Sequence, residues 1–263
     1  MNLSISNISW SADQDRQVYE LMQKYGFTGL EIAPTRIFPE NPYDKLDAVK
    51  KWAKNLTEQY GFSIPSMQSI WYGRKEKIFG SKEEFNVLAD YTKKAIDFAS
   101  VIGCKNLVFG CPRNRNLPNG ADASIGIKFF KEIGDYAASK NTVIGMEANP
   151  SIYNTNYMND TSSVIELIKE VDSDGFKLNL DMGTIIHNRE DVTELVGNVG
   201  IINHVHISEP GLRPIERRKI HAELKDILLS EEYQGYVSIE MGRVDGIVKL
   251  EGLMKYMKEI YKK

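Results

Sequence analysis

Four residues able to bind a metal or move a proton stand at the ends of four successive apolar segments. They are Glu147 in VIGMEANP, Asp181 in LNLDMGT, His206 in NHVHISEP and Glu240 in YVSIEM. Three carboxylates and one imidazole suit Mn²⁺, Mg²⁺ or Co²⁺ better than structural Zn²⁺, which prefers more histidine and cysteine. The constellation therefore predicts a divalent metal site and an enzyme.

The same four residues suit proton transfer on a sugar. A divalent ion could hold two adjacent sugar oxygens and stabilise an enediolate as a proton leaves the neighbouring carbon. Two carboxylates on opposite sides of that carbon are what a base and an acid need. Each residue alone also has a structural interpretation, such as a helix cap or a dipole partner, and the metal site rests on the four together. His204 alternates with His206, and we expect one of these histidines to face away from the barrel axis as a packing residue.

Short apolar segments and amphipathic segments alternate along the whole chain. The strand candidates cover residues 3–9, 29–34, 63–69, 106–110, 142–147, 176–181, 204–208 and 236–240. They are rich in Ile, Leu and Val, as parallel strands buried on both faces are. Helix patterns over 13–26, 43–61, 82–103 and 123–140 lie between strand candidates, and Gly26, Gly61 and Gly103 follow three of them as left-handed C-caps.

Eight strand–helix units without a break in composition predict one α/β domain over residues 1–263, a single (β/α)8 TIM barrel. An open doubly wound sheet would call for a GxGxxG turn after the first strand, and SNISWSADQD has none. Active sites of such barrels lie at the carboxyl ends of the strands. The four candidate ligands stand at such ends, as the barrel hypothesis requires.

The bulk composition indicates a soluble cytoplasmic protein whose partner is a small molecule. The chain has 263 residues and a formal net charge of −3, so it has no overall positive field for nucleic acid or an anionic membrane. Its apolar runs are shorter than the roughly 20 residues needed to span a bilayer. The segment MNLSISNISW lacks the features of a secretory signal, and two cysteines are too few for a disulfide framework.

At the four candidate ligands the sequence resembles the xylose isomerase-like TIM barrel superfamily, in its sugar phosphate isomerase and epimerase branch. NHVHISEP and GYVSIEM carry the likeness most specifically, and GLEI at 29–32 and CKNLVFGCPRNR are also familiar from the superfamily. The nearest relatives look like ketose 3-epimerases of the D-tagatose and D-psicose type. The resemblance covers essentially the whole chain.

The resemblance implies that Glu147, Asp181, His206 and Glu240 bind one divalent ion, Mn²⁺ first, with Co²⁺, Mg²⁺ or Zn²⁺ as alternatives. It implies that Glu147 and Glu240 are also the catalytic acid and base, which invert a carbon of a ketose through a metal-stabilised enediolate. It also implies a sugar or sugar phosphate as the substrate and a homodimer or homotetramer as the assembly.

Three positions depart from the epimerase pattern. The substrate-binding histidine three residues after the metal-binding aspartate is here Thr184, and the nearest histidine is His187. The second glutamate, six residues after the first metal-binding glutamate, is Tyr153, and the arginine six residues after the metal-binding histidine is Leu212, followed by Arg213. We therefore expect a substrate other than that of the epimerases, with His187 and Arg213 as substrate-binding candidates.

Three more polar residues are candidates for substrate binding. Gln68 ends the third strand candidate, and its amide could donate to a sugar hydroxyl or cap the loop. The segment CPRNRN follows the fourth strand and puts Arg113 and Arg115 at the active face, where Arg113 could bind a phosphate or a carboxylate; in the alternative, both are ordinary surface arginines of a solvated loop. Glu209 lies three residues after His206 and could orient that histidine or contact the substrate.

Three other functions remain open. A metal-dependent lyase or dehydratase acting on an oxidised sugar or inositol derivative would use the same four ligands. An AP endonuclease-like nuclease is less consistent with the sequence, because its three metal ions need more histidines and this chain has four, all from position 187 onward. A non-catalytic sugar-binding barrel would have no need of two opposed bases.

Overall fold

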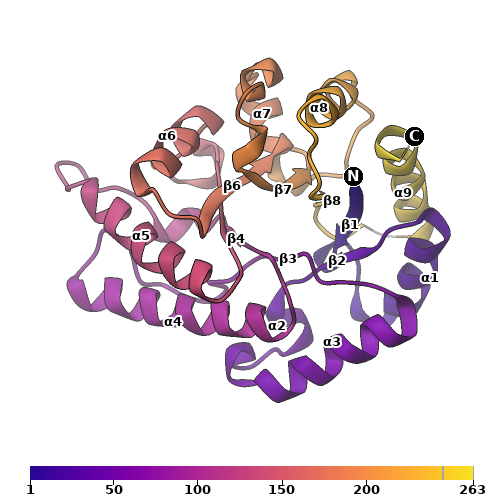
Figure 1. Ribbon diagram of the computed structural model, residues 1–263, viewed down its shortest axis with the longest axis horizontal. Coiled ribbons are helices and arrows are strands. Elements are labelled where there is room, and N and C mark those ends of the chain that lie inside the picture. The colour runs from indigo at the N-terminus through magenta and orange to yellow at the C-terminus, as the bar shows by residue number, and fades with distance from the viewer. Residues whose placement is uncertain (245, 263) are drawn as a thin grey trace.

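The computed structural model describes residues 1–244 and 246–262, in which strands and helices alternate around a barrel (Figure 1). The strands are β1 Asn2–Ser6, β2 Gly29–Glu31, β3 Ser66–Met67, β4 Asn106–Phe109, β5 Ile144–Glu147, β6 Phe176–Asp181, β7 Ile202–Ile207 and β8 Tyr236–Ile239. They pair in parallel in the order β2-β1-β8-β7-β6-β5-β4-β3. The predicted eight-stranded α/β barrel is therefore confirmed.

The ring closes between β2 and the segment that leads into β3. Parallel bridges join Gly29 to Ser63 and Ile32 to Met67, and the amide of Leu30 donates to the Ser63 carbonyl at 2.9 Å. Pro65 interrupts this second segment, and a proline has no N–H to give to a neighbouring strand. The strand predicted over 63–69 is therefore reduced to two residues.

The helices form the outer layer (Figure 1). Their bounds are α1 Asp15–Tyr25, α2 Pro34–Ile37, α3 Leu46–Tyr60, α4 Lys82–Val101, α5 Ser124–Ser139, α6 Thr161–Val171, α7 Met182–Asn188, α8 Lys219–Ser230 and α9 Ile247–Tyr261. The predicted C-cap Gly26 has a φ of 75°, a left-handed conformation that glycine adopts without cost. Gly61 and Gly103 have similar values of 76° and 70°. No helix within the described residues has the length and apolar character needed to cross a membrane.

Each strand separates an apolar layer from a polar barrel interior. In β1, Leu3 and Ile5 are fully buried among the apolar side chains of the core, while Ser4 and Ser6 alternate with them and point to the other face. The interior side chains contact one another through polar groups, as when Asn106 Nδ2 donates to Ser66 Oγ at 3.0 Å. Polar side chains of the barrel interior, including Ser66, Asn106 and Asn179, are therefore hydrogen-bonded to one another below the site.

Candidate metal centre

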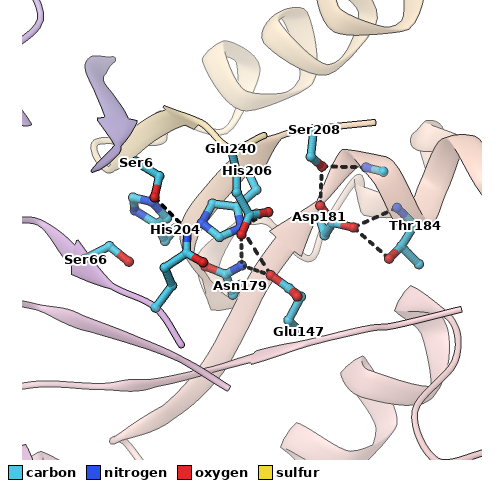
Figure 2. Close-up of polar contacts among 12 residues, drawn as sticks. Ser6, Ser66, Glu147, Asn179, Asp181, Thr184, His204, His206, Ser208 and Glu240 are labelled. Carbon is cyan, nitrogen blue, oxygen red and sulfur yellow. Dashed lines mark hydrogen bonds and ion pairs between the residues drawn. The ribbon is translucent and has the colours of Figure 1, made fainter. Parts of the chain in front are cut away.

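The four residues singled out by the sequence converge at the carboxyl ends of the last four strands (Figure 2). Glu147 and Asp181 are the final residues of β5 and β6, His206 lies near the end of β7, and Glu240 directly follows β8. One donor atom from each of the four lies within 4.8 Å of the others. His206 is fully buried and the three carboxylate residues are each 8% exposed. The fold therefore gathers a compact donor set shielded from bulk water.

The two ring nitrogens of His206 face different carboxylates. Nδ1 lies 3.1 Å from Oε2 of Glu147 and 3.1 Å from Oε2 of Glu240. Nε2 lies 2.8 Å from Oε2 of Glu31, a fully buried carboxylate at the end of β2. When Nε2 donates its proton to Glu31, the Nδ1 lone pair faces the two glutamates and Nδ2 of Asn179 at 3.3 Å, in a position to bind a cation.

His204 contacts the same carboxylate, with Nε2 3.0 Å from Oε2 of Glu31. The expectation that one histidine faces away was wrong, because residues two apart in a strand point to the same face. Burial by itself would raise the pKa of Glu31, but His206 and His204 outweigh it and hold that pKa well below the ordinary value. Burial also lowers the pKa of His204, which favours its neutral form.

Asp181 is held from two sides. It is the N-cap of α7 and accepts hydrogen bonds from both N and Oγ1 of Thr184, each at 2.8 Å (Figure 2). Its other oxygen accepts from Oγ of Ser208, and that hydroxyl accepts in turn from the amide of Gly183 at 2.8 Å. Thr184 is thus committed to orienting Asp181 and does not take the place of a substrate-binding histidine.

Glu147 is oriented from inside the barrel by a chain of amides. Asn179 Nδ2 donates to Glu147 Oε2 at 3.0 Å, and Asn106 Nδ2 donates to Asn179 Oδ1 at 3.2 Å. Gly145 leaves room for this chain, because a Cβ at that position would lie 2.4 Å from Asn106 Oδ1.

The carboxylates of the site carry more negative charge than their surroundings offset. Burial, which outweighs the lowering effect of His206, combines with the charges of Glu147 and Asp181 to raise the pKa of Glu240 to about 7. Burial and Glu147 likewise raise the pKa of Asp181. Burial opposes protonation of His206, yet Glu240 and Glu31 keep its pKa well above the ordinary value. A divalent cation would supply the missing positive charge, and three carboxylates with one imidazole suit a Mn²⁺-type ion.

A cavity of about 220 Å³ opens over the carboxylates. Gln68 lines it, and its Nε2 donates to Ser6 Oγ at 2.7 Å and to Glu31 Oε1 at 3.1 Å. Glu209 lines it as well, but its carboxylate is held by Arg218 at 2.6 and 2.7 Å and makes no hydrogen bond to His206. Glu31 therefore occupies the place beside the histidine that the sequence suggested for Glu209.

Three other substrate-binding candidates lie outside the lining of this cavity. Arg113 and Arg213 are exposed, and Arg213 Nη2 comes only within 3.9 Å of Glu209. His187 is exposed on α7, where the helix carries its side chain away from the cavity lining. Tyr153 does line the cavity, and its hydroxyl accepts from the amide of Gly211 at 2.8 Å.

Sequence reasoning missed the roles of two charged residues. Glu31 is the only charged residue of the apolar segment GLEI. It shares a strand face with Gly29, opposite the apolar Leu30, and this alternation could have indicated that it points into the barrel interior. Arg115 is fully buried, and its guanidinium donates to the backbone carbonyls of Glu147 at 2.8 Å and Met158 at 3.2 Å. Burial lowers the pKa of Arg115 to about 10. No local pattern distinguishes this arginine from the exposed Arg113.

The chain belongs to the xylose isomerase-like TIM barrel family, which it matches over residues 19–260, so the predicted resemblance is confirmed. A search of curated proteins found no match.

Several solved structures share the fold at low sequence identity. A D-psicose 3-epimerase, solved in the presence of D-fructose, is 15% identical, with a TM-score of 0.78 and 100% of each chain covered. A 3-keto-D-glucoside 4-epimerase from E. coli is 17% identical, with a TM-score of 0.75, over 98% of this chain and 99% of the other. An AP endonuclease of family 2 from Brucella melitensis is 20% identical, with a TM-score of 0.74 and the same coverage. At these identities the likeness concerns the fold.

Proposed function

We propose that the protein is a divalent-metal-dependent isomerase or epimerase that moves a proton on a sugar or a sugar derivative. The observation that carries this proposal is the placement of Glu147 and Glu240. Both carboxylates lie 3.1 Å from Nδ1 of His206, they belong to different strands, and both line the cavity. A pair of carboxylates around one donor set provides both a proton acceptor and a proton donor beside a bound molecule.

The chain's own residues divide the work. Glu147, Asp181, His206 and Glu240 would hold the ion, which when bound offsets negative charge that develops on substrate oxygens. One of the two glutamates removes a proton from a carbon next to the carbonyl group. The other delivers a proton, and delivery to the opposite face of the same carbon gives an epimer, whereas delivery to the adjacent carbon gives an isomer.

The structural neighbours support this choice over a nuclease. Two of the three proteins compared above are named as sugar epimerases, although one is named as an AP endonuclease. Within residues 1–244 and 246–262, the two clusters of metal-binding side chains share His206, so they are not independent sites. That arrangement does not supply the separate ligand sets that a three-metal nuclease would need.

Metal content tests the proposal at its foundation. The purified protein, measured by elemental analysis after Mn²⁺ loading and desalting, should hold about one equivalent of the ion. Asp181→Ala should lose it, and Asp174→Ala, which changes an exposed aspartate before β6, should not. The loaded protein should then exchange a carbon-bound proton of a ketose for deuterium in D₂O. Absence of both metal uptake and exchange would refute the proposal, and a product that is lighter than the substrate by one water would show a dehydratase instead.

A further inference from the structure

The side-chain amide of Asn149 has a fixed orientation. Its Nδ2 donates to Glu147 Oε1 at 2.9 Å and to the Ala148 carbonyl at 3.0 Å. Rotating the amide by half a turn would set its oxygen against these two acceptors, which cannot donate in return. The backbone is fixed too, because the amide of Asn149 donates to Met158 O at 3.0 Å and its carbonyl accepts from Asn159 Nδ2 at 2.7 Å.

This orientation leaves Oδ1 of Asn149 without a partner, although the residue is only 6% exposed. A buried acceptor without a hydrogen bond costs free energy, so such atoms are uncommon and call for an explanation. Asn149 lines the cavity, as does Gly110, and a Cβ on Gly110 would lie 3.5 Å from Asn149 Oδ1 and 3.0 Å from Glu147 Oε1. The free oxygen therefore lies in the cavity wall, almost without accessible surface, beside Gly110 and a candidate catalytic carboxylate.

The charge of the cavity bears on which groups can enter that space. Among the described residues that line it, four are carboxylic acids and none is lysine, arginine or histidine. One of the four, Glu209, is paired with Arg218, which leaves the three candidate ligands of the ion. A divalent cation would not outweigh those three carboxylates, and a phosphate over them would bring further negative charge to a cavity whose lining offers no cationic side chain. Arg74, Lys75 and Arg113 line a neighbouring pocket that shares Ser69, Cys111 and Pro112 with this cavity, and Arg74 is paired there with Glu76.

We propose that Asn149 is a specificity-determining residue whose Oδ1 accepts a hydrogen bond from a hydroxyl group of the substrate, and that the substrate is an uncharged polyhydroxy ketone rather than its phosphate ester. The inference rests on the proposed function, since it assumes that a ketose lies over the carboxylates. It explains the orphaned acceptor, because a hydroxyl donates where a phosphate oxygen cannot. Asn149 is thus a substrate-recognition residue in addition to the three positions, Thr184, Tyr153 and Leu212, at which the chain departs from the epimerase pattern.

The test compares Mn²⁺-loaded wild-type protein with Asn149→Ala by calorimetric binding. The probes are free ketopentoses and ketohexoses, their monodeoxy forms, and their phosphate esters. In the wild type, removal of the hydroxyl that donates to Oδ1 should weaken binding about tenfold. In Asn149→Ala the parent and that deoxy sugar should bind equally. Loss of the Nδ2 bonds to Glu147 affects both sugars alike, so this comparison isolates Oδ1. Asn55→Ala, an exposed change on α3, should behave as wild type.

The outcomes separate the inference from the proposed function. Tighter binding of free ketoses than of their phosphate esters, together with a deoxy penalty that disappears in Asn149→Ala, supports the inference. Tighter binding of a phosphate ester, or a penalty of the same size in both proteins, overturns it and leaves the proposed function standing. Failure of every sugar and ester to bind or to exchange protons overturns both.

Discussion

Oε2 of Glu31 lies 2.8 Å from Nε2 of His206, across the barrel from the carboxylates that approach Nδ1 of the same ring. Glu31 is itself fixed, because its other oxygen accepts from Gln68 Nε2 at 3.1 Å. A buried carboxylate in this place sets which nitrogen of the imidazole carries the proton and which binds a cation.

Replacement of Glu31 should therefore weaken metal binding without removing a ligand. We expect Glu31→Ala to lower the affinity for Mn²⁺ about 10- to 100-fold, and Glu31→Gln to have a smaller effect because its amide oxygen still accepts. Competition with a chelating dye measures the dissociation constant. Glu20→Ala, on the exposed face of α1, is the matched control. Wild-type affinity in a folded Glu31→Ala protein would contradict this role.

Glu147 and Glu240 are expected to act in the chemical step as well as in metal binding. Glu147→Gln and Glu240→Gln should each keep the fold and lower turnover by at least about 100-fold, since a glutamine cannot exchange a proton with a carbon atom. Turnover should be measured at saturating Mn²⁺, with metal content determined on the same samples, and folding followed by circular dichroism. An active glutamine variant with full metal content would exclude that residue as acid or base.

The pKa of Glu240 predicts how the stability of the metal-free protein depends on pH. The folded-state pKa of about 7 exceeds the ordinary value of 4.5, so between these values the folded protein binds more protons than the unfolded chain. Stability from this residue is thus present below about pH 4.5 and is lost as pH rises through 7, a change of about 3 kcal/mol. Glu240→Gln should lack this loss.

Urea unfolding in the presence of a chelator, at pH 5 and pH 8, measures the difference between wild type and Glu240→Gln. The variant should gain stability relative to the wild type on going to pH 8, and Mn²⁺ should remove that advantage by stabilising the wild-type carboxylate. An equal difference at both pH values would show that Glu240 ionises normally.

Arg115 and Arg113 provide a matched pair, two residues apart and differing in burial. Arg115→Met should destabilise the protein by about 2–4 kcal/mol, because it removes the buried hydrogen bonds that the guanidinium donates to the carbonyls of Glu147 and Met158. Arg113→Ala should change stability by less than about 0.5 kcal/mol and should leave binding of sugars and sugar phosphates alike unchanged. Equal urea midpoints for the two variants would remove the structural role given to Arg115.

The ends of the last four strands were predictable because each is a short apolar run that leads to a polar residue. Such local patterns placed Glu147, Asp181 and Glu240 at one rim, since parallel strands share the direction of their carboxyl ends. The strand predicted over 3–9 ends at Ser6, and a 3-10 turn spans Asn7–Ser9, so its boundary could not be read from composition. Where a strand ends depends on its pairing with neighbouring strands, which the local sequence does not contain.

The surroundings of the candidate ligands were less predictable than the ligands. The prediction for His204 was wrong because residues two apart in a strand point to the same face, a rule that can be applied to the sequence alone. The burial of Arg115 and Glu209 could not have been predicted, because it depends on partners in other loops. Arg115 donates to the carbonyl of Met158, and Glu209 accepts from Arg218. Side chains in loops acquire their environment only when the whole barrel has assembled.

The first and last strands, β1 and β8, pair with each other, so the ring cannot close before both have been synthesised. Glu31 is made early, whereas Glu240 follows β8, the last strand in the chain, which pairs with both β7 and β1. A nascent chain that has already emerged through β7 carries Glu147, Asp181 and His206 but lacks the opposing carboxylate. The complete set of four candidate ligands is therefore present only after β8 has been made and the ring can close.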